Sequence, residues 1–205
     1  MNGGDDVSRE TMAALADLSP AAARAISALA DWTASHAAPI GLTNFHTPHQ
    51  VLTHGIAPAI SLAALPNSPP AATWAELGPG SGVLGLTLAL LLPDAHVTLV
   101  DRRQRVIDYL ELTIARAAIA NATALLLDPD RDPGAARWDT VLFRALTRPS
   151  DALSMASRLA TRGICAFHSP TVTAYEAPPA GFARADTQPT LAPNLALTRY
   201  HRLTA

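Results

Sequence analysis

The sequence contains no lysine and only one cysteine, Cys165. All 15 basic residues are therefore arginines, which excludes chemistry that needs a lysine nucleophile or a Schiff base. A single cysteine cannot form a disulfide within the chain, and this is compatible with a reducing compartment. We expect Cys165 to lie in a buried strand and to pack there rather than to react.

Strong charge of one sign and long apolar runs are also missing. The net charge of −2 argues against a generally basic nucleic-acid binder, although a local arginine patch could still contact RNA. The longest apolar run, residues 83–92, is too short to span a membrane and ends at Pro93, so it predicts a buried helix. The first seven residues lack the basic and apolar regions of a signal peptide. We therefore expect a cytoplasmic protein that does not bind membranes.

The chain is long enough for one ordinary core, because almost half of its 205 residues are hydrophobic. Residues 1–65 are expected to form a helical appendage that covers a cleft, with helix starts at Ser19-Pro20 and Thr47-Pro48. Gly55 and Pro58 should bend or divide the second of these helices. The proline-rich stretch 66–70 predicts a stiff linker, and residues 71–205 form the expected second domain.

From residue 72 onward, short β-rich runs alternate with helical stretches, which indicates an α/β fold with a parallel sheet. The expected strands are 73–78, 96–101, 123–127, 138–143 and 163–168, and the expected helices are 82–92, 103–120 and 151–161. The runs 182–187 and 195–201 have no helix between them and predict an antiparallel hairpin at the sheet edge. This C-terminal hairpin is typical of class I (Rossmann-like) methyltransferases and unusual in dinucleotide folds.

The segment 76–82, Glu-Leu-Gly-Pro-Gly-Ser-Gly, follows the first expected strand. Its glycines at 78, 80 and 82 allow a sharp turn and the close approach of a ligand to the backbone. Glu76 could accept a hydrogen bond from a cationic or amine-bearing ligand, and Asp101, at the end of the next strand, could bind both hydroxyls of a ribose. The segment therefore predicts a nucleoside cofactor.

Two cofactor classes remain open for this segment. Residues 80–85 also satisfy the dinucleotide pattern G-x-G-x-x-G, with Asp101 near the expected distance beyond it. The acid at Glu76 and the alternating glycines favour S-adenosylmethionine instead. A glycine turn with a purely structural role is the third interpretation.

Other candidates lie just after the later strands, where ligands bind in open α/β sheets. Asp128 or Asp130 could bind an adenine amino group or could be solvated turn acids. Arg144 follows an apolar strand, so it would lie beside the cofactor or an anionic substrate group, unless it is a surface arginine.

The arginines at 102, 103 and 105 could bind RNA phosphates or simply be solvated, and because they oppose the dipole of the helix they open, a compensating acid is expected nearby. His46, His49 and His54 match no standard zinc ligand set, so no metal is expected.

With these residues placed, the chain resembles the bacterial small-subunit ribosomal RNA guanine-N7 methyltransferases, also called the glucose-inhibited division protein B family. The resemblance runs over nearly the whole chain. It is carried by residues 7–11, Trp32, Leu42-Thr43, His54, 76–85, 97–101, Tyr109-Leu110, Asn121 and 138–145.

The resemblance implies an S-adenosylmethionine-dependent fold, with cofactor contacts on Gly78, Val83, Pro129, Asp130 and Arg144. Together with the candidates above, the expected cofactor-binding residues are Glu76, Gly78, Gly80, Gly82, Val83, Asp101, Pro129, Asp130 and Arg144. The expected substrate-binding residues are Arg102, Arg105 and His54.

The implied substrate is guanine N7 in small-subunit ribosomal RNA. This atom carries a free lone pair, so methyl transfer needs correct positioning and no general base, and no catalytic residue is assigned. The chain departs from the family mainly on the substrate side, for example at Gly41, Ala57-Pro58, Arg105-Val106 and His168-Ser169. Methylation of a small molecule or a protein, and a noncatalytic cofactor-binding role, therefore stay open. A monomer is expected.

Overall fold

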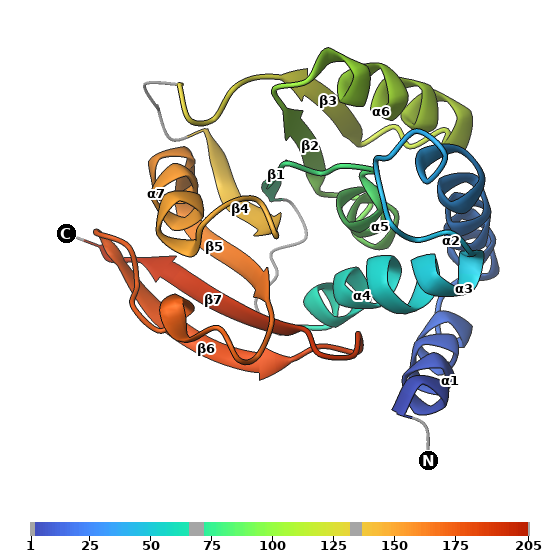
Figure 1. Cartoon of the computed structure of the whole chain (residues 1–205), viewed down its shortest axis with the longest axis horizontal. Coiled ribbons are helices and arrows are strands. Elements are labelled where there is room, and N and C mark those ends of the chain that lie inside the picture. The colour runs from blue at the N-terminus through green and yellow to red at the C-terminus, as the bar shows by residue number, and fades with distance from the viewer. Residues whose placement is uncertain (1–2, 66–71, 132–136, 205) are drawn as a thin grey trace.

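The computed structural model describes residues 3–65, 72–131 and 137–204 (Figure 1). A seven-stranded sheet with the order β3-β2-β1-β4-β5-β7-β6 forms its centre. The strands are β1 Thr73–Leu77, β2 His96–Asp101, β3 Ala122–Leu126, β4 Trp138–Arg144, β5 Ala160–His168, β6 Phe182–Pro189 and β7 Ala196–Arg202. Strands β1 to β5 are parallel, and β7 is antiparallel to both β5 and β6. The predicted α/β fold with a C-terminal hairpin is confirmed.

Helices surround this sheet on both faces. The α-helices are α1 Gly3–Ala16, α2 Pro20–Trp32, α3 Pro48–Gln50, α4 Ala57–Ala63, α5 Val83–Leu91, α6 Gln104–Ala117 and α7 Pro149–Leu159. Two π-helical segments, η1 Thr33–Ala37 and η2 Val51–Ile56, and a short 3-10 helix, η3 Thr173–Tyr175, complete the set. In the described part of the chain, no helix is long and apolar enough to cross a membrane.

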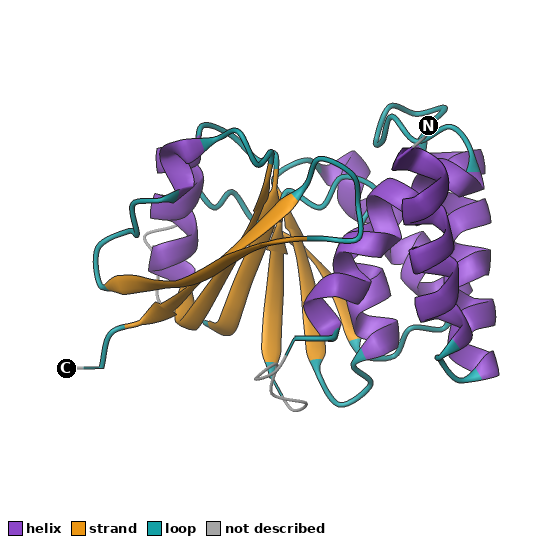
Figure 2. Cartoon of the chain, turned by 90° about the horizontal axis from the view of Figure 1, so that it is seen from below, coloured by secondary structure: helices purple, strands orange, loops and turns teal. Residues whose placement is uncertain are grey.

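The two faces of the sheet are covered unequally (Figure 2). Alternate residues of a strand point to opposite faces, so Trp74 joins the larger buried cluster with residues of α2, α4, α5 and α6, whereas Leu77 joins a second cluster with α7. On the α7 side, the described residues between β3 and β4, 127–131 and 137, form no helix. This leaves room beside the carboxyl ends of β1 and β2.

The N-terminal helices begin where the sequence predicts. Ser19 caps α2 by accepting a hydrogen bond from the Ala22 N–H at 3.2 Å, and Thr47 forms a capping box with Gln50 at the start of α3. Near Gly55 and Pro58, where a bend or division is expected, the helix changes from the π-helix η2 to the α-helix α4.

The core is continuous between the N-terminal helices and the sheet. Leu29 of α2 and Leu62 of α4 belong to the same buried cluster as Leu99 of β2. The division into an appendage and a methyltransferase domain stays a prediction, and the predicted linker 66–70 lies outside the described residues. Cys165 is buried in β5, and burial raises the pKa of its thiol to about 12, as expected for a packing residue.

Candidate functional site: a pocket at the carboxyl ends of β1 and β2

The turn after β1 keeps a conformation that only glycine adopts easily. Gly80 has a φ of +57°, and a Cβ at this position would lie 2.9 Å from the backbone carbonyl oxygen of Leu42. Gly82 has a φ of +71° and precedes α5 directly. The glycines therefore let the turn pass closely beneath the loop between η1 and α3.

Two N–H groups of this turn have partners within the protein. The Gly78 N–H donates to the Val100 carbonyl at 2.9 Å, and the Gly82 N–H donates to the Pro79 carbonyl at 2.8 Å. In dinucleotide folds the corresponding helix start binds a pyrophosphate through free backbone N–H groups. The Gly78 and Gly82 N–H groups are not free in this way.

Glu76 reinforces this conclusion. Its side chain is buried, and its carboxylate accepts a hydrogen bond from the Gly85 N–H of α5 at 2.9 Å. Burial raises the pKa of the Glu76 carboxyl to about 8, against the lowering effects of the Gly85 hydrogen bond and of Arg144. At neutral pH this carboxyl group is therefore largely protonated, and it occupies the Gly85 N–H, which is not free to bind a phosphate.

A pocket of about 470 Å³ opens beside this turn, on the α7 side of the sheet. Its walls come from the ends of β1, β2 and β4, from the loop after β3, and from α7. The lining residues are Gly78, Val100, Asp101, Arg102, Arg103, Asp128, Pro129, Asp130, Ala145, Leu146, Thr147, Asp151 and Met155. This volume suits a nucleoside-sized ligand.

The lining of the pocket is more acidic than basic. Among the described residues, the lining includes the carboxylates of Asp101, Asp128, Asp130 and Asp151 and two guanidinium groups. S-adenosylmethionine carries a positive sulfonium centre, whereas a dinucleotide carries two phosphate charges. The charge of the pocket therefore fits the methyl donor and opposes the dinucleotide.

Asp101 lies at the end of β2 with its carboxylate directed to this pocket, and only 4% of its side chain is exposed. Both carboxylate oxygens accept hydrogen bonds from Arg103, which lies two residues later. The acid expected to compensate the arginine cluster is thus Asp101 itself. A buried carboxylate that faces a cavity can bind the hydroxyls of a ribose.

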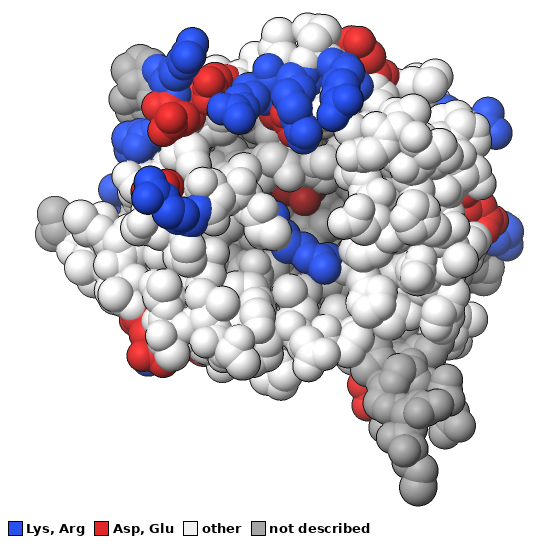
Figure 3. Space-filling view, viewed as in Figure 1, with Lys and Arg blue, Asp and Glu red and all other residues white. Residues whose placement is uncertain are grey.

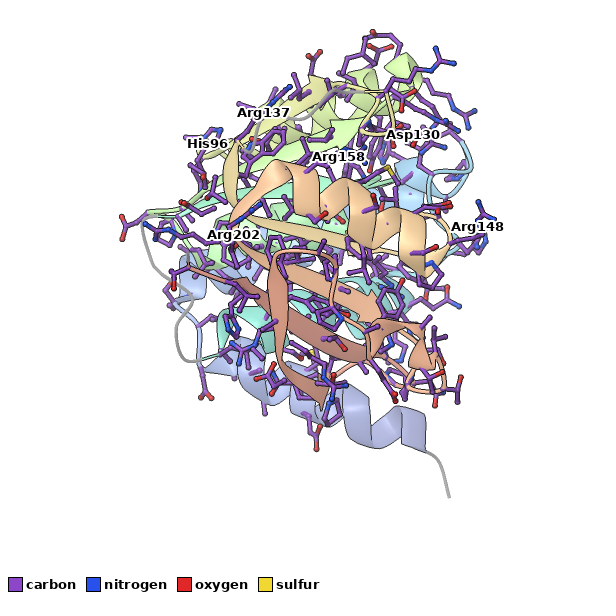
Figure 4. The ribbon with its side chains drawn as sticks, turned by 90° about the vertical axis from the view of Figure 1, so that its left-hand side faces the viewer. His96, Asp130, Arg137, Arg148, Arg158 and Arg202 are labelled. Carbon is purple, nitrogen blue, oxygen red and sulfur yellow. The ribbon has the colours of Figure 1, made fainter. Side chains whose placement is uncertain are left out.

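The loop after β3 places Pro129 and Asp130 at the pocket. Asp128 accepts a hydrogen bond from the Asp130 N–H at 3.1 Å, and the Pro129 carbonyl accepts one from Arg158 of α7 at 2.9 Å. The loop is therefore fixed to the helix on the opposite wall. Figure 4 shows Asp130 and Arg148 at one end of the sheet, and His96 and Arg202 at the other.

Arg144 ends β4 and lies between the sheet and the N-terminal helices. Its guanidinium donates a hydrogen bond to the His54 carbonyl, which lacks its usual α-helical donor because Pro58 has no N–H. It also lies 5.7 Å from the centroid of the Phe45 ring. Burial lowers the pKa of Arg144, and Glu76 raises it. Arg144 thus connects the glycine turn region to η2 and does not line the pocket.

Of the remaining expected site residues, only Arg102 is among the described residues that line the pocket. Val83 is buried at the start of α5 and packs against Gly55. Arg102 lines the pocket, whereas Arg105 is exposed on α6 and is not part of the lining. His54 stacks on Phe45, with 5.8 Å between ring centroids, and burial is the main cause that lowers its pKa.

Figure 3 shows the hollow in this face, with acidic atoms at its floor, a basic side chain beside them and a row of basic side chains along one rim. The structure brings Gly78, Asp101, Arg102, Pro129 and Asp130 together at the pocket. Among the described side chains, no cluster of three or more His, Cys, Asp or Glu residues could hold a metal ion.

Sequence reasoning missed the α7 wall. Asp151 and Met155 line the pocket from the first turns of this helix, and Leu146 and Thr147 line it from the preceding loop. The only available signal was their position after the fourth strand. It also missed that Arg103 binds Asp101, because the (i, i+2) spacing does not reveal a contact across a turn.

Comparison with known proteins supports this description. The family model described as rRNA small subunit methyltransferase G matches residues 22–168. A protein named ribosomal RNA small subunit methyltransferase G from Myxococcus xanthus is 33% identical over 144 residues, which cover 69% of this chain and 64% of the relative. The protein of the same name from Aromatoleum aromaticum is 28% identical over 150 residues, covering 71% of this chain and 70% of the relative. The chain thus spans about two thirds of the length of these relatives.

Solved structures show the same fold. TrmN from Thermus thermophilus has a TM-score of 0.61 at 18% identity and covers 84% of this chain and 53% of its own. Magnesium protoporphyrin IX methyltransferase from Synechocystis, solved with bound SAM, has a TM-score of 0.61 at 18% identity. The match covers 87% of this chain and 97% of the methyltransferase chain. Because the family model covers more than half of the sequence, the chain belongs to the rRNA small subunit methyltransferase G family.

Proposed function

We propose that this protein is an S-adenosylmethionine-dependent methyltransferase that methylates N7 of a guanine in small-subunit ribosomal RNA. The observation that carries the proposal is the family match over residues 22–168. The relatives named above are ribosomal RNA small subunit methyltransferases, which supports both the reaction and the RNA substrate. The family and its methyltransferase structural relatives also support S-adenosylmethionine as the cofactor.

The residues of the pocket fit this cofactor. Asp101 would hold the ribose hydroxyls, and the loop at Pro129 and Asp130 would contact the adenine. The turn at Gly78 and Gly80 would lie along the bound cofactor. When bound, S-adenosylmethionine supplies an electrophilic methyl group on its sulfonium sulfur. The net negative lining favours this cation over an anionic nucleotide.

The protein's own part in the reaction would be to position the reactants and to exclude water. The lone pair of guanine N7 is free at neutral pH, so the protein needs no general base, and none is assigned. Arg144 is partly buried between Glu76 of β1 and the His54 carbonyl of η2, where it would hold the N-terminal helices in place. Alignment of the reacting atoms in such an enclosed site can supply much of the rate enhancement.

The RNA would contact the basic rim of the pocket. Arg102, Arg103 and Arg105 are exposed at the start of α6 and could bind phosphates, and His54 lies on the N-terminal side of the cleft. The overall charge of −2 limits such contacts to this local patch. A cytoplasmic location would give the protein access to ribosomal RNA.

The direct test uses labelled S-adenosylmethionine and small ribosomal subunits, or RNA stripped from them, from a strain that lacks the gene. After nuclease digestion, we expect the label in 7-methylguanosine. The matched control is Asp101→Asn, which should lower incorporation at limiting cofactor. Cofactor binding without label in any guanine nucleoside would contradict the RNA reaction and favour another methyl acceptor or a noncatalytic role.

A further inference from the structure

Arg103 and Asp101 form a close ion pair at the pocket. The Arg103 backbone N–H and Nε each donate to Oδ1 of Asp101 at 3.0 Å, and Nη2 donates to Oδ2 at 2.9 Å. Both residues line the pocket. The carboxylate that faces the nucleoside space is therefore bound by a side chain of the same protein.

The geometry of this contact resembles that of a ribose on a carboxylate. A guanidinium presents two parallel N–H donors to the two carboxylate oxygens, and a vicinal diol presents two O–H donors in the same way. Because Arg103 lines the pocket and its guanidinium occupies both Asp101 oxygens, a ribose in the pocket would compete with it for the same oxygens.

We propose that Arg103 occupies the ribose subsite when no cofactor is bound, and that the cofactor must displace its guanidinium from Asp101. This inference rests on the proposed function, because it takes the pocket to be the nucleoside site. It makes Arg103 a residue that sets cofactor affinity without contacting the reacting atoms.

The other acids of the pocket carry weaker contacts. Arg131 lies 3.6 Å from Asp128, and Arg148 lies 2.9 Å from Asp151, each through Nε to a single carboxylate oxygen. Those two acids are 26% and 42% exposed, so water can solvate them. Asp101 is only 4% exposed, and among the described residues Arg103 is its only side-chain partner, so the carboxylate would be left without one if Arg103 simply left. A buried carboxylate needs a replacement donor, which the ribose provides.

The position of Arg103 also allows its guanidinium to leave the Asp101 carboxylate. The Arg103 side chain is 47% exposed, so its guanidinium can be solvated once it is released. The backbone N–H of Arg103 can remain on Oδ1 and keep the Asp101 carboxylate in place. Displacement therefore requires a side-chain rotation and no rearrangement of β2 or α6.

Such competition raises the apparent Kd of the cofactor. The apparent Kd equals the intrinsic Kd divided by the fraction of molecules in which Asp101 is accessible. Removing the Arg103 guanidinium should therefore tighten binding, although it removes an ion pair. An arginine that bound the cofactor directly would have the opposite effect. The direction of the change distinguishes the two roles.

The test measures binding of S-adenosylhomocysteine by calorimetry to the wild-type protein, Arg103→Ala, Arg103→Met and Arg184→Ala. We expect Kd to fall about fivefold or more in both Arg103 variants, in the range of typical coupling effects. Arg184 carries the same charge but is exposed on β6 and does not line the pocket, so Arg184→Ala should leave Kd nearly unchanged.

A second arm identifies the group that competes with Arg103. Adenosine should also bind more tightly to Arg103→Ala, whereas 2′,3′-dideoxyadenosine should show no gain. Equal gains for both nucleosides, or unchanged or weaker binding to both Arg103 variants, would overturn the inference while the proposed function stands. Thermal unfolding without ligand confirms that each variant is folded. Failure of the wild-type protein to bind any of these ligands would overturn the proposed function as well.

Discussion

The turns that follow β1 and β2 lie side by side, yet they satisfy their polar groups in different ways. After β1, backbone carbonyls and the buried Glu76 carboxyl bind the N–H groups of Gly78, Gly82 and Gly85. After β2, the partner of Asp101 is a half-exposed arginine side chain. The contacts of the first turn are made by backbone groups and a buried side chain. The contact of the second turn is made by a half-exposed side chain, which a ligand could replace.

This difference assigns separate roles to the two turns. The glycine turn provides shape, because the Gly78 and Gly82 N–H groups already have partners and the glycines permit close approach. In the proposed account Asp101 provides a binding group, because it lines the pocket and its partner Arg103 is half-exposed and can be solvated once released. Substitutions in the first turn should therefore change stability, and substitutions in the second should change ligand affinity.

The largest effect is expected for Gly82→Ala. The residue would keep a φ of +71° with a Cβ placed 2.4 Å from a Leu110 methyl carbon. Left-handed strain and overpacking together should lower the free energy of unfolding by about 2–4 kcal/mol. Urea denaturation followed by circular dichroism measures this loss.

Gly41→Ala is the matched control for that variant. Gly41 has a φ of +72°, but a Cβ would meet no atom within 4 Å, so only the conformational strain of about 1–2 kcal/mol is expected. Equal losses in the two variants would show that packing around Gly82 contributes nothing.

Glu76→Gln should change how stability depends on pH. The folded-state pKa of about 8 lies above the ordinary value of 4.5, so between these values the folded protein holds a proton that the unfolded chain releases. Wild-type stability should fall as pH rises through this window, by up to about 1.4 kcal/mol per pH unit from this group, and then level off.

Glutamine does not titrate, so Glu76→Gln should lack this contribution while keeping an acceptor for the Gly85 N–H. Denaturation of both proteins at pH 5.5 and pH 7.5 provides the comparison. Parallel pH profiles would mean that Glu76 is ionised in the folded protein.

Asp101→Asn should act on affinity. It keeps the size of the side chain but removes the charge and one acceptor from the proposed ribose site. We expect the Kd of S-adenosylhomocysteine to rise about tenfold or more, as for the loss of a hydrogen bond to a charged group. Calorimetry measures this change. An unchanged Kd in a folded variant would remove Asp101 from the ribose role.

The smallest effect is expected for Arg105→Ala on the exposed start of α6. Loss of one phosphate contact should weaken RNA binding several-fold and lower the slope of log K against log salt by about 1. Filter binding over a range of salt concentrations measures both quantities. The exposed Arg184 on β6, at the far edge of the sheet, serves as the control because its loss should leave the slope unchanged.

The sequence predicts the sheet well because its signals are local. Apolar runs mark the strands, and Ser19 and Thr47 mark helix starts that the structure confirms. The sequence also places Asp101 at the end of β2. Contacts between distant elements could not be derived in this way. Pro58 releases the His54 carbonyl, but only the folded chain shows that Arg144 binds it.

The wall formed by Asp151 and Met155 depends on the angle at which α7 packs, which no local pattern specifies. The role of Glu76 was open for the same reason. Its position before the glycine turn suggested a ligand contact, while the structure shows a buried partner for the Gly85 N–H. Whether it also contacts the cofactor stays a prediction, as do the other site assignments.

The most direct test of the nucleoside pocket is a crystal structure of the protein with S-adenosylhomocysteine. We predict that the ribose hydroxyls lie within hydrogen-bond distance of both Asp101 carboxylate oxygens, with the adenine beside Pro129 and Asp130. S-adenosylhomocysteine bound with its ribose away from Asp101 would contradict this account.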